Sequence, residues 1–259
     1  MRWARFERHG AVSYGIVQGE TIETVDGSPF GVHHRTGRAY PLNTVKLLVP
    51  VIPPTFYAAG LNYVGHVKDQ QAQGQKVNVP EKPDMGYRAA NALVASGDPV
   101  VIPRDAGPRI QYEAELVVVI GKQAKHLSEA DALSCVFGYT IGNDVSERDW
   151  QKSDRTFWRS KNTDTFKPMG PWIETDVNLD ELKTTVRVNG KTTIEFPTNH
   201  MLFGIARYIS TMTRYLTLHP GDIIWMGTEG TSPNLKAGDQ VDIEISGIGT
   251  LSNRFVAET

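Results

Sequence analysis

The chain has 259 residues and a net charge of −2, which gives no electrostatic basis for binding nucleic acid or an anionic membrane surface. Its single cysteine excludes an intrachain disulfide and favours a reducing, cytoplasmic environment. Apolar residues make up 40% of the chain, but no apolar run approaches the roughly 20 residues that a membrane span needs. We therefore expect a soluble globular protein of the cytoplasm.

The N-terminal part is predicted to be a small unit of its own. Apolar and polar residues alternate over roughly the first 25 residues, with turn-forming residues between the alternating stretches, which is typical of β-hairpins. Prolines then cluster between residues 50 and 54 and predict a boundary there. We therefore expect a small N-terminal β domain at residues 1–52 and a larger, catalytic domain at residues 53–259.

The larger domain contains short apolar segments that predict strands. They lie at residues 99–103, 116–120 and 137–143. The polar segment 69–83 has almost nothing to bury, so it is either a plain surface loop or a lid. An Asn-Gly pair at residues 189–190 predicts a hairpin turn. Because the chain lacks a regular βαβ rhythm, we expect a β-rich α+β fold.

One amphipathic helix is predicted in the last quarter of the chain. Apolar residues recur at helical spacing between residues 199 and 213, and Thr198 or Asn199 is a suitable N-cap. We therefore expect the helix to begin at one of these two residues. Further on, residues 241–245 alternate between apolar and acidic side chains and predict a half-buried strand.

Two glutamates, Glu113 and Glu115, come directly before the apolar strand 116–120. Residues i and i+2 of a strand point to the same face about 6.6–7 Å apart, so these carboxylates project together. Like charges at that distance repel each other unless a cation lies between them. Asp144 follows the strand 137–143 and would join the pair if the two strands are neighbours. Three carboxylates without Cys or His nearby are typical of a hard ion, Mg²⁺ or Ca²⁺, or else Mn²⁺.

A Glu-x-Glu pair is weak evidence for a metal site when it stands alone. Asp242 and Glu244 have the same spacing, and we expect them to face water. Glu113 and Glu115 differ because the strand that follows them is apolar on both faces. A pair of glycosidase carboxylates is another interpretation, but it requires two acids that face each other across a groove.

A possible catalytic pair lies earlier in the chain. His66 and Asp69 are three residues apart, which makes them neighbours on a helical turn. A carboxylate beside a histidine fixes the imidazole tautomer and raises its basicity, so the pair could draw a proton from water. The alternative is an ordinary His-Asp contact on a surface helix.

The chain contains six motifs in a fixed order: GLNYVGH, YEAELVVVIGK, GYTIGNDVSERDWQ, WRSKNTDTFKPMGPWI, PGDIIWMGTEG and LKAGDQVDIEISGIGTLSN. Together they resemble the fumarylacetoacetate hydrolase family. The resemblance runs from about residue 55 to the end, and the N-terminal hairpins also resemble that family's small first domain. It implies a mixed β-roll with a metal at its open end, usually in a homodimer.

The resemblance assigns catalytic roles to individual residues. It implies that Glu113, Glu115 and Asp144 are the Mg²⁺ or Ca²⁺ ligands and that Lys161 is the family's catalytic lysine. It also implies that His66 is the catalytic histidine. The charge of Lys161 would help to balance the three carboxylates and could hold an anionic substrate.

The resemblance also assigns substrate contacts. Arg148 and Gln151 match positions that hold the 2-oxo-carboxylate end of the substrate, and Thr228 matches the threonine of a GT loop. The chain departs from the family pattern at two places. Asp69 stands where a glutamate is most common, and Arg88 stands where many members have lysine.

The expected reaction depends on a divalent ion that chelates a 2-oxo acid and stabilises its enolate. We expect hydrolysis of a carbon–carbon bond in an acylpyruvate-type 2,4-diketo acid, because His66 has an acidic partner for activating water. An alternative is a decarboxylase or an isomerase (tautomerase) acting on a 2-oxo or 2-hydroxydienoate diacid from aromatic catabolism, which needs no attacking water. An alternative of another class is a metal-binding homologue that has lost catalysis.

Overall fold

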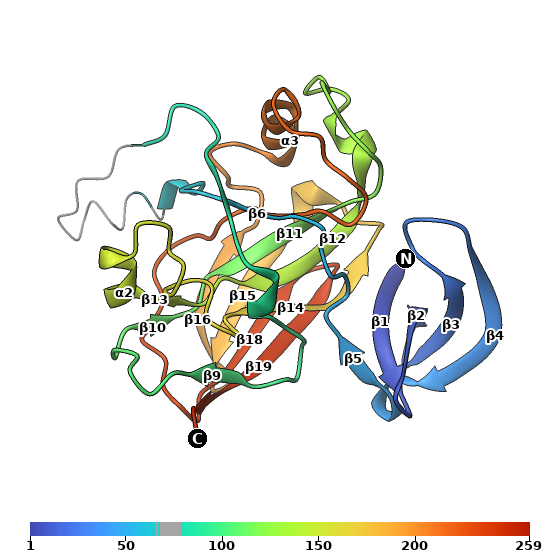
Figure 1. The fold of residues 1–259 in the computed structure, drawn as a ribbon, viewed down its shortest axis with the longest axis horizontal. Coiled ribbons are helices and arrows are strands. Elements are labelled where there is room, and N and C mark those ends of the chain that lie inside the picture. Colours follow the sequence, from blue (N-terminus) through green and yellow to red (C-terminus); the bar gives the residue numbers. More distant parts are fainter. Residues whose placement is uncertain (66, 68–78) are drawn as a thin grey trace.

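Figure 1 presents a computed structural model that describes residues 1–65, 67 and 79–259. The β-rich fold expected from the sequence is confirmed, because strands dominate these residues. None of the helices in them is long and apolar enough to cross a membrane. Helices with both ends in the described residues are α2 (Arg148–Ser153), α3 (Ile205–Thr213) and the short 3-10 helices Leu42–Thr44, Ala90–Ala92, Ala132–Cys135 and Leu179–Glu181.

One large mixed sheet runs through the molecule (Figure 1). Its strand order is β4-β3-β2-β1-β14-β12-β11-β17-β6-β7, with β5 beside β1 and β8 beside β14. Its strands are β1 (Arg2–Arg8), β2 (Ala11–Gln18), β3 (Thr21–Gly27), β4 (His33–Pro41), β5 (Lys46–Leu48), β6 (Phe56–Ala59), β7 (Met85–Tyr87), β8 (Leu93–Val94), β11 (Ala114–Ile120), β12 (Val136–Asn143), β14 (Lys167–Glu174) and β17 (Ile223–Trp225).

A second sheet has the order β16-β15-β18-β19-β9, and a two-stranded sheet joins β10 to β13. The predicted hairpin at residues 189–190 connects β15 to β16, and both turn residues have positive φ, 52° and 77°. The strands of these two sheets are β9 (Val100–Ile102), β10 (Ile110–Gln111), β13 (Ser146–Glu147), β15 (Lys183–Val188), β16 (Lys191–Pro197), β18 (Gln240–Ile245) and β19 (Gly249–Ala257).

Strand β11 lies in the middle of the core, between β12 and β17, and all of its residues are buried. Because side chains alternate along a strand, Leu116, Val118 and Ile120 pack into one apolar cluster with the second sheet and α3. Val117 and Val119 pack into another cluster on the opposite face. The prediction of a strand that is apolar on both faces is therefore confirmed.

The N-terminal strands β1 to β5 form an antiparallel group at one end of the large sheet, on the right in Figure 1. Hairpins between these strands match the alternation in the sequence. Strand β1 also pairs with β14, with Arg2 opposite Glu174 and Trp3 opposite Ile173. Hydrogen bonding therefore continues across the predicted boundary at residues 52 and 53, which stays a prediction.

The predicted start of the helix at Thr198 or Asn199 is wrong, because α3 begins at Ile205. The segment just before it is held by the side chain and backbone of Asn62. This asparagine accepts hydrogen bonds from the backbone N–H groups of Leu202 and Phe203. These N–H groups are therefore used in tertiary contacts, and helical periodicity alone does not reveal them.

Gly142 allows the packing of the large sheet between β12 and β17 to be tested by mutation. It lies in β12 directly opposite Glu115, and a Cβ added here would lie 2.7 Å from the ring of Trp225. We predict that Gly142→Ala lowers the free energy of unfolding by about 1–3 kcal/mol, because the buried ring has no room to move. Denaturant unfolding measures this loss. Gly31→Ala, where a Cβ meets nothing within 4 Å, is the control and should unfold like the parent.

Candidate metal centre and substrate pocket

The three predicted metal ligands meet where β11 and β12 pair. Glu115 belongs to β11, Glu113 lies just before that strand, and Asp144 follows β12 directly. The strands are antiparallel, and the backbone N–H of Asp144 donates to the carbonyl of Glu113 at 2.8 Å. One oxygen from each of the three carboxylates lies within 4.8 Å of the others. All three side chains are buried, so the pairing of these strands assembles a compact acidic site.

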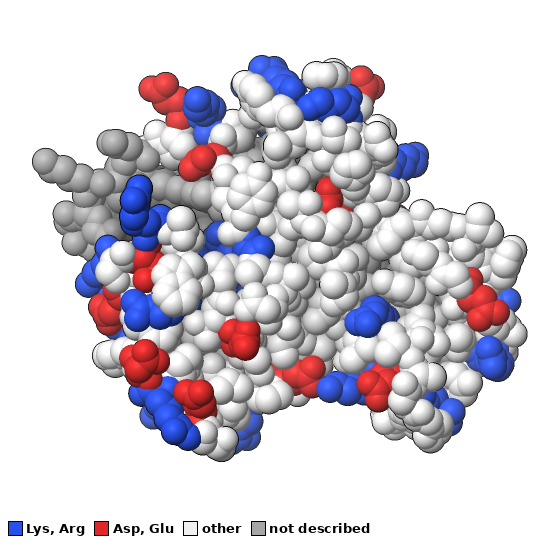
Figure 2. Space-filling model, viewed as in Figure 1, with Lys and Arg blue, Asp and Glu red and all other residues white. Residues whose placement is uncertain are grey.

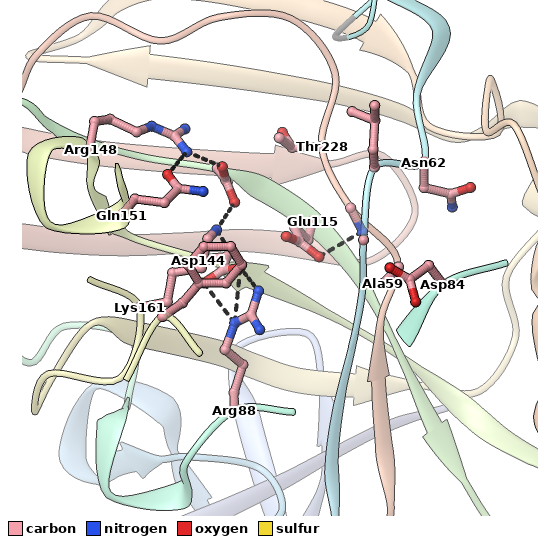
Figure 3. A pocket seen from close by; sticks show the side chains of 15 residues that line it. Ala59, Asn62, Asp84, Arg88, Glu115, Asp144, Arg148, Gln151, Lys161 and Thr228 are labelled. Carbon is pink, nitrogen blue, oxygen red and sulfur yellow. Dashed lines mark hydrogen bonds and ion pairs between the residues drawn. The ribbon is translucent and has the colours of Figure 1, made fainter. Parts of the chain in front are cut away.

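Cationic side chains surround Asp144 (Figure 3). Its two carboxylate oxygens receive the Arg88 guanidinium at 2.9 Å, the Lys161 ammonium at 2.9 Å and the Lys167 ammonium at 2.7 Å. Buried charges are stable only when they are paired in this way. Burial raises the pKa of Asp144, but these cations outweigh burial and hold the pKa well below its usual value.

Glu113 is held at both of its oxygens. Lys161 donates to one oxygen at 2.5 Å and Arg148 approaches the other at 2.8 Å. Burial raises the pKa of Glu113, but Lys161 and Arg148 outweigh burial and lower it. Lys161 thereby bridges Glu113 and Asp144, which fixes the distance between these two carboxylates.

Glu115 differs from the other two acids because no salt bridge to it is found among the described residues. It accepts a hydrogen bond from the backbone N–H of Gly227 at 2.7 Å. Burial and the nearby charges of Asp144 and Glu113 raise the pKa of Glu115 to about 8. Cations therefore compensate the negative charges of Asp144 and Glu113, whereas the charge of Glu115 has no such partner among the described residues.

Lys167 is a site residue that the sequence reasoning missed. Its ammonium is completely buried and donates to the carbonyls of Val145 and Phe166 at 3.0 and 2.8 Å, in addition to its contact with Asp144. Burial lowers the pKa of Lys167 to about 7, although Asp144 opposes that shift. The sequence contains one indication of this role. Lys167 begins the apolar segment KPMGPWI, where the charge of a lysine needs a buried partner.

Helix α2 supplies the two predicted contacts for the substrate carboxylate. Arg148 is its first residue, and Arg148 donates to the side chains of Gln151 at 2.9 Å and Gln111 at 2.7 Å. Since the same guanidinium also touches Glu113, α2 connects the acidic site to the rim of the pocket.

The carboxylates open into a cavity of about 330 Å³. The structure brings seven of the nine predicted site residues to this cavity, with Arg88 beside them. His66 and Asp69 lie outside the described residues, as does most of the predicted loop or lid at 69–83. The lining residues are Ala59, Gly60, Leu61, Asn62, Asp84, Arg88, Glu113, Glu115, Asp144, Arg148, Gln151, Phe157, Lys161, Gly227 and Thr228.

Residues 55–256 match the family model for the C-terminal domain of fumarylacetoacetate (FAA) hydrolase. The chain belongs to the fumarylacetoacetate hydrolase family. The resemblance inferred from the six sequence motifs is therefore confirmed. Residues 1–50 match a second family model, described as Rv2993c-like, N-terminal.

Similar proteins from this family have several activities. The chain is 35% identical to Protein Rv2993c of Mycobacterium tuberculosis, covering 99% of this chain and 98% of that one. It is 37% identical to the oxaloacetate tautomerase YisK of Bacillus subtilis, covering 83% of this chain and 75% of that one.

Solved structures also share the fold. A 5-carboxymethyl-2-hydroxymuconate delta-isomerase from Mycobacterium smegmatis has a TM-score of 0.90 and 35% identity, with both chains covered completely. A maleylpyruvate hydrolase from Sphingobium, solved with manganese(II) and pyruvate, has a TM-score of 0.81 and 26% identity, again over both complete chains. Isomerisation, tautomerisation and hydrolysis are therefore all represented among proteins of similar fold.

The side chains present fit a hard divalent cation. Three carboxylates supply the oxygen donors that Mg²⁺, Ca²⁺ and Mn²⁺ prefer. The lack of a cationic partner for Glu115 among the described residues also fits, because a divalent ion beside Glu115 would supply the missing positive charge. The acidic cluster is thus a candidate site for a hard divalent ion.

We predict that Glu115→Gln weakens binding of Mg²⁺ and Mn²⁺ by more than about 100-fold, because removing a direct ligand has a larger effect than the 10–100-fold of an outer-shell change. Isothermal titration calorimetry on chelator-treated protein measures the affinity for each ion. The control is Glu244→Gln, from the Asp-x-Glu pair of β18, whose carboxylate is bonded to Arg187 and 43% exposed. Equal affinities for the parent and the Glu115 variant would refute the ligand assignment.

Proposed function

We propose that this protein is a divalent-metal-dependent tautomerase or isomerase that interconverts the enol and keto forms of a 2-oxo acid. One observation carries the proposal. Buried carboxylates that suit a metal lie at the base of a cavity whose wall also holds Lys161, Arg148 and Arg88. Such a site attracts an anionic substrate and favours negative charge developing on its oxygen.

A divalent ion bound by the three carboxylates would act as a Lewis acid on the 2-oxo group of the substrate. Arg148 lines the cavity and can donate to the substrate carboxylate, while Gln151 holds the guanidinium in position. Lys161 lies between Glu113 and Asp144, so its ammonium can stabilise negative charge on the enolate oxygen. Because Lys161 is almost fully buried, this interaction is stronger than it would be in water.

Tautomerisation is favoured over the hydrolysis expected from the sequence. It requires an enolate to be stabilised and a proton to be moved, and both needs can be met without an activated water. Relatives with 35–37% identity to the chain are named as tautomerases and isomerases. A diacid such as oxaloacetate or a hydroxymuconate is therefore the first substrate class to examine.

A second candidate is hydrolysis of an acylpyruvate. The observation that favours it is the similar hydrolase structure that contains manganese(II) and pyruvate. In that reaction His66, oriented by Asp69, would activate the attacking water. We also propose that the protein forms a homodimer and is located in the cytoplasm.

The decisive experiment follows two signals from one substrate panel in the presence of Mg²⁺ or Mn²⁺. Enol absorbance reports interconversion of oxaloacetate and of hydroxydienoates, and pyruvate release reports cleavage of acylpyruvates. Enol conversion without pyruvate supports the tautomerase, whereas pyruvate from acylpyruvates alone supports the hydrolase. Failure to turn over any substrate while the metal is bound would favour a homologue that has lost catalysis.

We predict that Lys161→Met lowers kcat/KM for enol conversion by about 10²–10³-fold, the effect of removing one donor that stabilises an oxyanion. Steady-state kinetics at saturating metal measures the loss. Lys183→Met is the matched control, because that lysine pairs with Glu195 on the exposed surface of β15. The control should retain the parent kcat/KM, and a Lys161 variant that does the same would contradict the assigned role.

A further inference from the structure

Glu147 is a buried acid that lies behind the site and outside its cavity. It is 0% exposed and immediately precedes α2. One of its carboxylate oxygens accepts a hydrogen bond from the backbone N–H of Trp150, which caps the helix. Its own backbone N–H donates to the carbonyl of Ser160 at 3.0 Å, and it pairs with Ile110 between β10 and β13. The backbone of Glu147 therefore links β10 to the segment at Ser160, and its side chain holds the start of α2.

Two of these segments carry the cations that hold Glu113. Arg148 follows Glu147 directly, and Lys161 follows Ser160 directly. Arg148 contacts one oxygen of Glu113 at 2.8 Å, and Lys161 contacts the other at 2.5 Å. We propose that Glu147 is a positioning residue that sets where both cations lie relative to Glu113, and thereby organises the anion-binding side of the pocket.

The cap alone does not explain why a glutamate is present. Serine or asparagine, which are common helix caps, would accept the same hydrogen bond with a shorter side chain. The second carboxylate oxygen of Glu147 has no hydrogen-bond partner among the described residues. A Cβ at Gly107 would lie 2.9 Å from this oxygen, so the backbone of Gly107 packs against the carboxylate. The Glu147 carboxylate thus makes two contacts at once, with the backbone N–H of Trp150 at the start of α2 and with the backbone at Gly107.

The inference rests on the proposed function, because the two positioned cations are the groups assigned to the anionic substrate and its enolate. In Glu147→Ala, α2 loses its cap and the contact around the carboxylate. We expect Arg148 and Lys161 to become less well placed and the affinity for oxalate, a non-reacting mimic of the 2-oxo-carboxylate, to fall roughly tenfold. In turnover, the loss should appear mainly as a higher KM.

The first measurement needs no ligand. Hydrogen exchange should become faster in Glu147→Ala both at residues 148–153 and at residues 157–161, the segment that delivers Lys161. Unchanged exchange at 157–161 would overturn the proposal. This readout is independent of catalysis, so a parent protein that binds no oxalate counts against the proposed function and leaves the test of Glu147 intact.

Calorimetry of oxalate with Mg²⁺ provides the second measurement, with two comparison variants. Asn178→Ala removes a side-chain cap of the same kind from the remote helix Leu179–Glu181. We expect Asn178→Ala and Glu147→Ala each to lower Tm by about 2–4 °C, but Asn178→Ala should leave oxalate affinity unchanged. Glu147→Gln keeps an oxygen that can cap Trp150 and should restore oxalate affinity to within about threefold of the parent. A Gln variant as weak as the Ala variant would overturn the proposal.

A double-mutant cycle with Arg148→Met completes the test. If Glu147 acts through Arg148, the combined loss of oxalate affinity should fall well short of the product of the two single losses. Losses that multiply would mean that Glu147 affects binding through general stability instead. That outcome would refute the positioning role.

Discussion

The antiparallel pairing of β11 with β12 is the constraint on which the rest of the site depends. It places Glu113 and Glu115 beside Asp144 as largely buried side chains at the cavity. Three carboxylates in such a place repel one another strongly, since a low dielectric weakens screening. The cations in contact with these acids can be understood as a response to this repulsion; they are Arg88, Arg148, Lys161 and Lys167.

The three carboxylates of the acidic site are compensated by positive charge to different degrees. Asp144 and Glu113 are in contact with fixed cations, which hold the pKa of each carboxyl below its usual value. Glu115 has only a backbone donor among the described residues, so its negative charge is disfavoured. Under the proposed function, this asymmetry would favour a cation beside Glu115 and leave Lys161 and Arg148 available to an anion. Preorganised charge of this kind is the main source of catalysis in many enzymes.

The carboxylates could be predicted from the sequence because the period of a strand determines which side chains share a face. Asp144 could be added because two buried apolar segments have a strong tendency to pair. Lys167 could not be found in this way, because a basic residue in an apolar strand does not reveal which acid it faces. The start of α3 was missed for a related reason, since the contacts of Asn62 with Leu202 and Phe203 connect residues 140 positions or more apart.

The activities of similar proteins narrow the expected reaction to tautomerisation, isomerisation or hydrolysis. A tautomerase and a hydrolase in this family share the need for an electron-poor pocket around a 2-oxo acid. They differ in whether a base and a water reach the distal carbonyl. Under the proposed function, the three carboxylates and their cations would serve either reaction, and an activated water would be needed for hydrolysis alone.

The pairing of β1 with β14 has a consequence for how the chain can be divided. Strand β14 begins with Lys167, the buried lysine behind Asp144, and its other edge is hydrogen bonded to β12. A shortened chain that starts at residue 53 would leave part of β14 as an open edge and would uncover the apolar contacts of Trp3. The N-terminal strands therefore cover the end of β14 at Ile173 and Glu174 and protect that edge of the large sheet from pairing with other molecules.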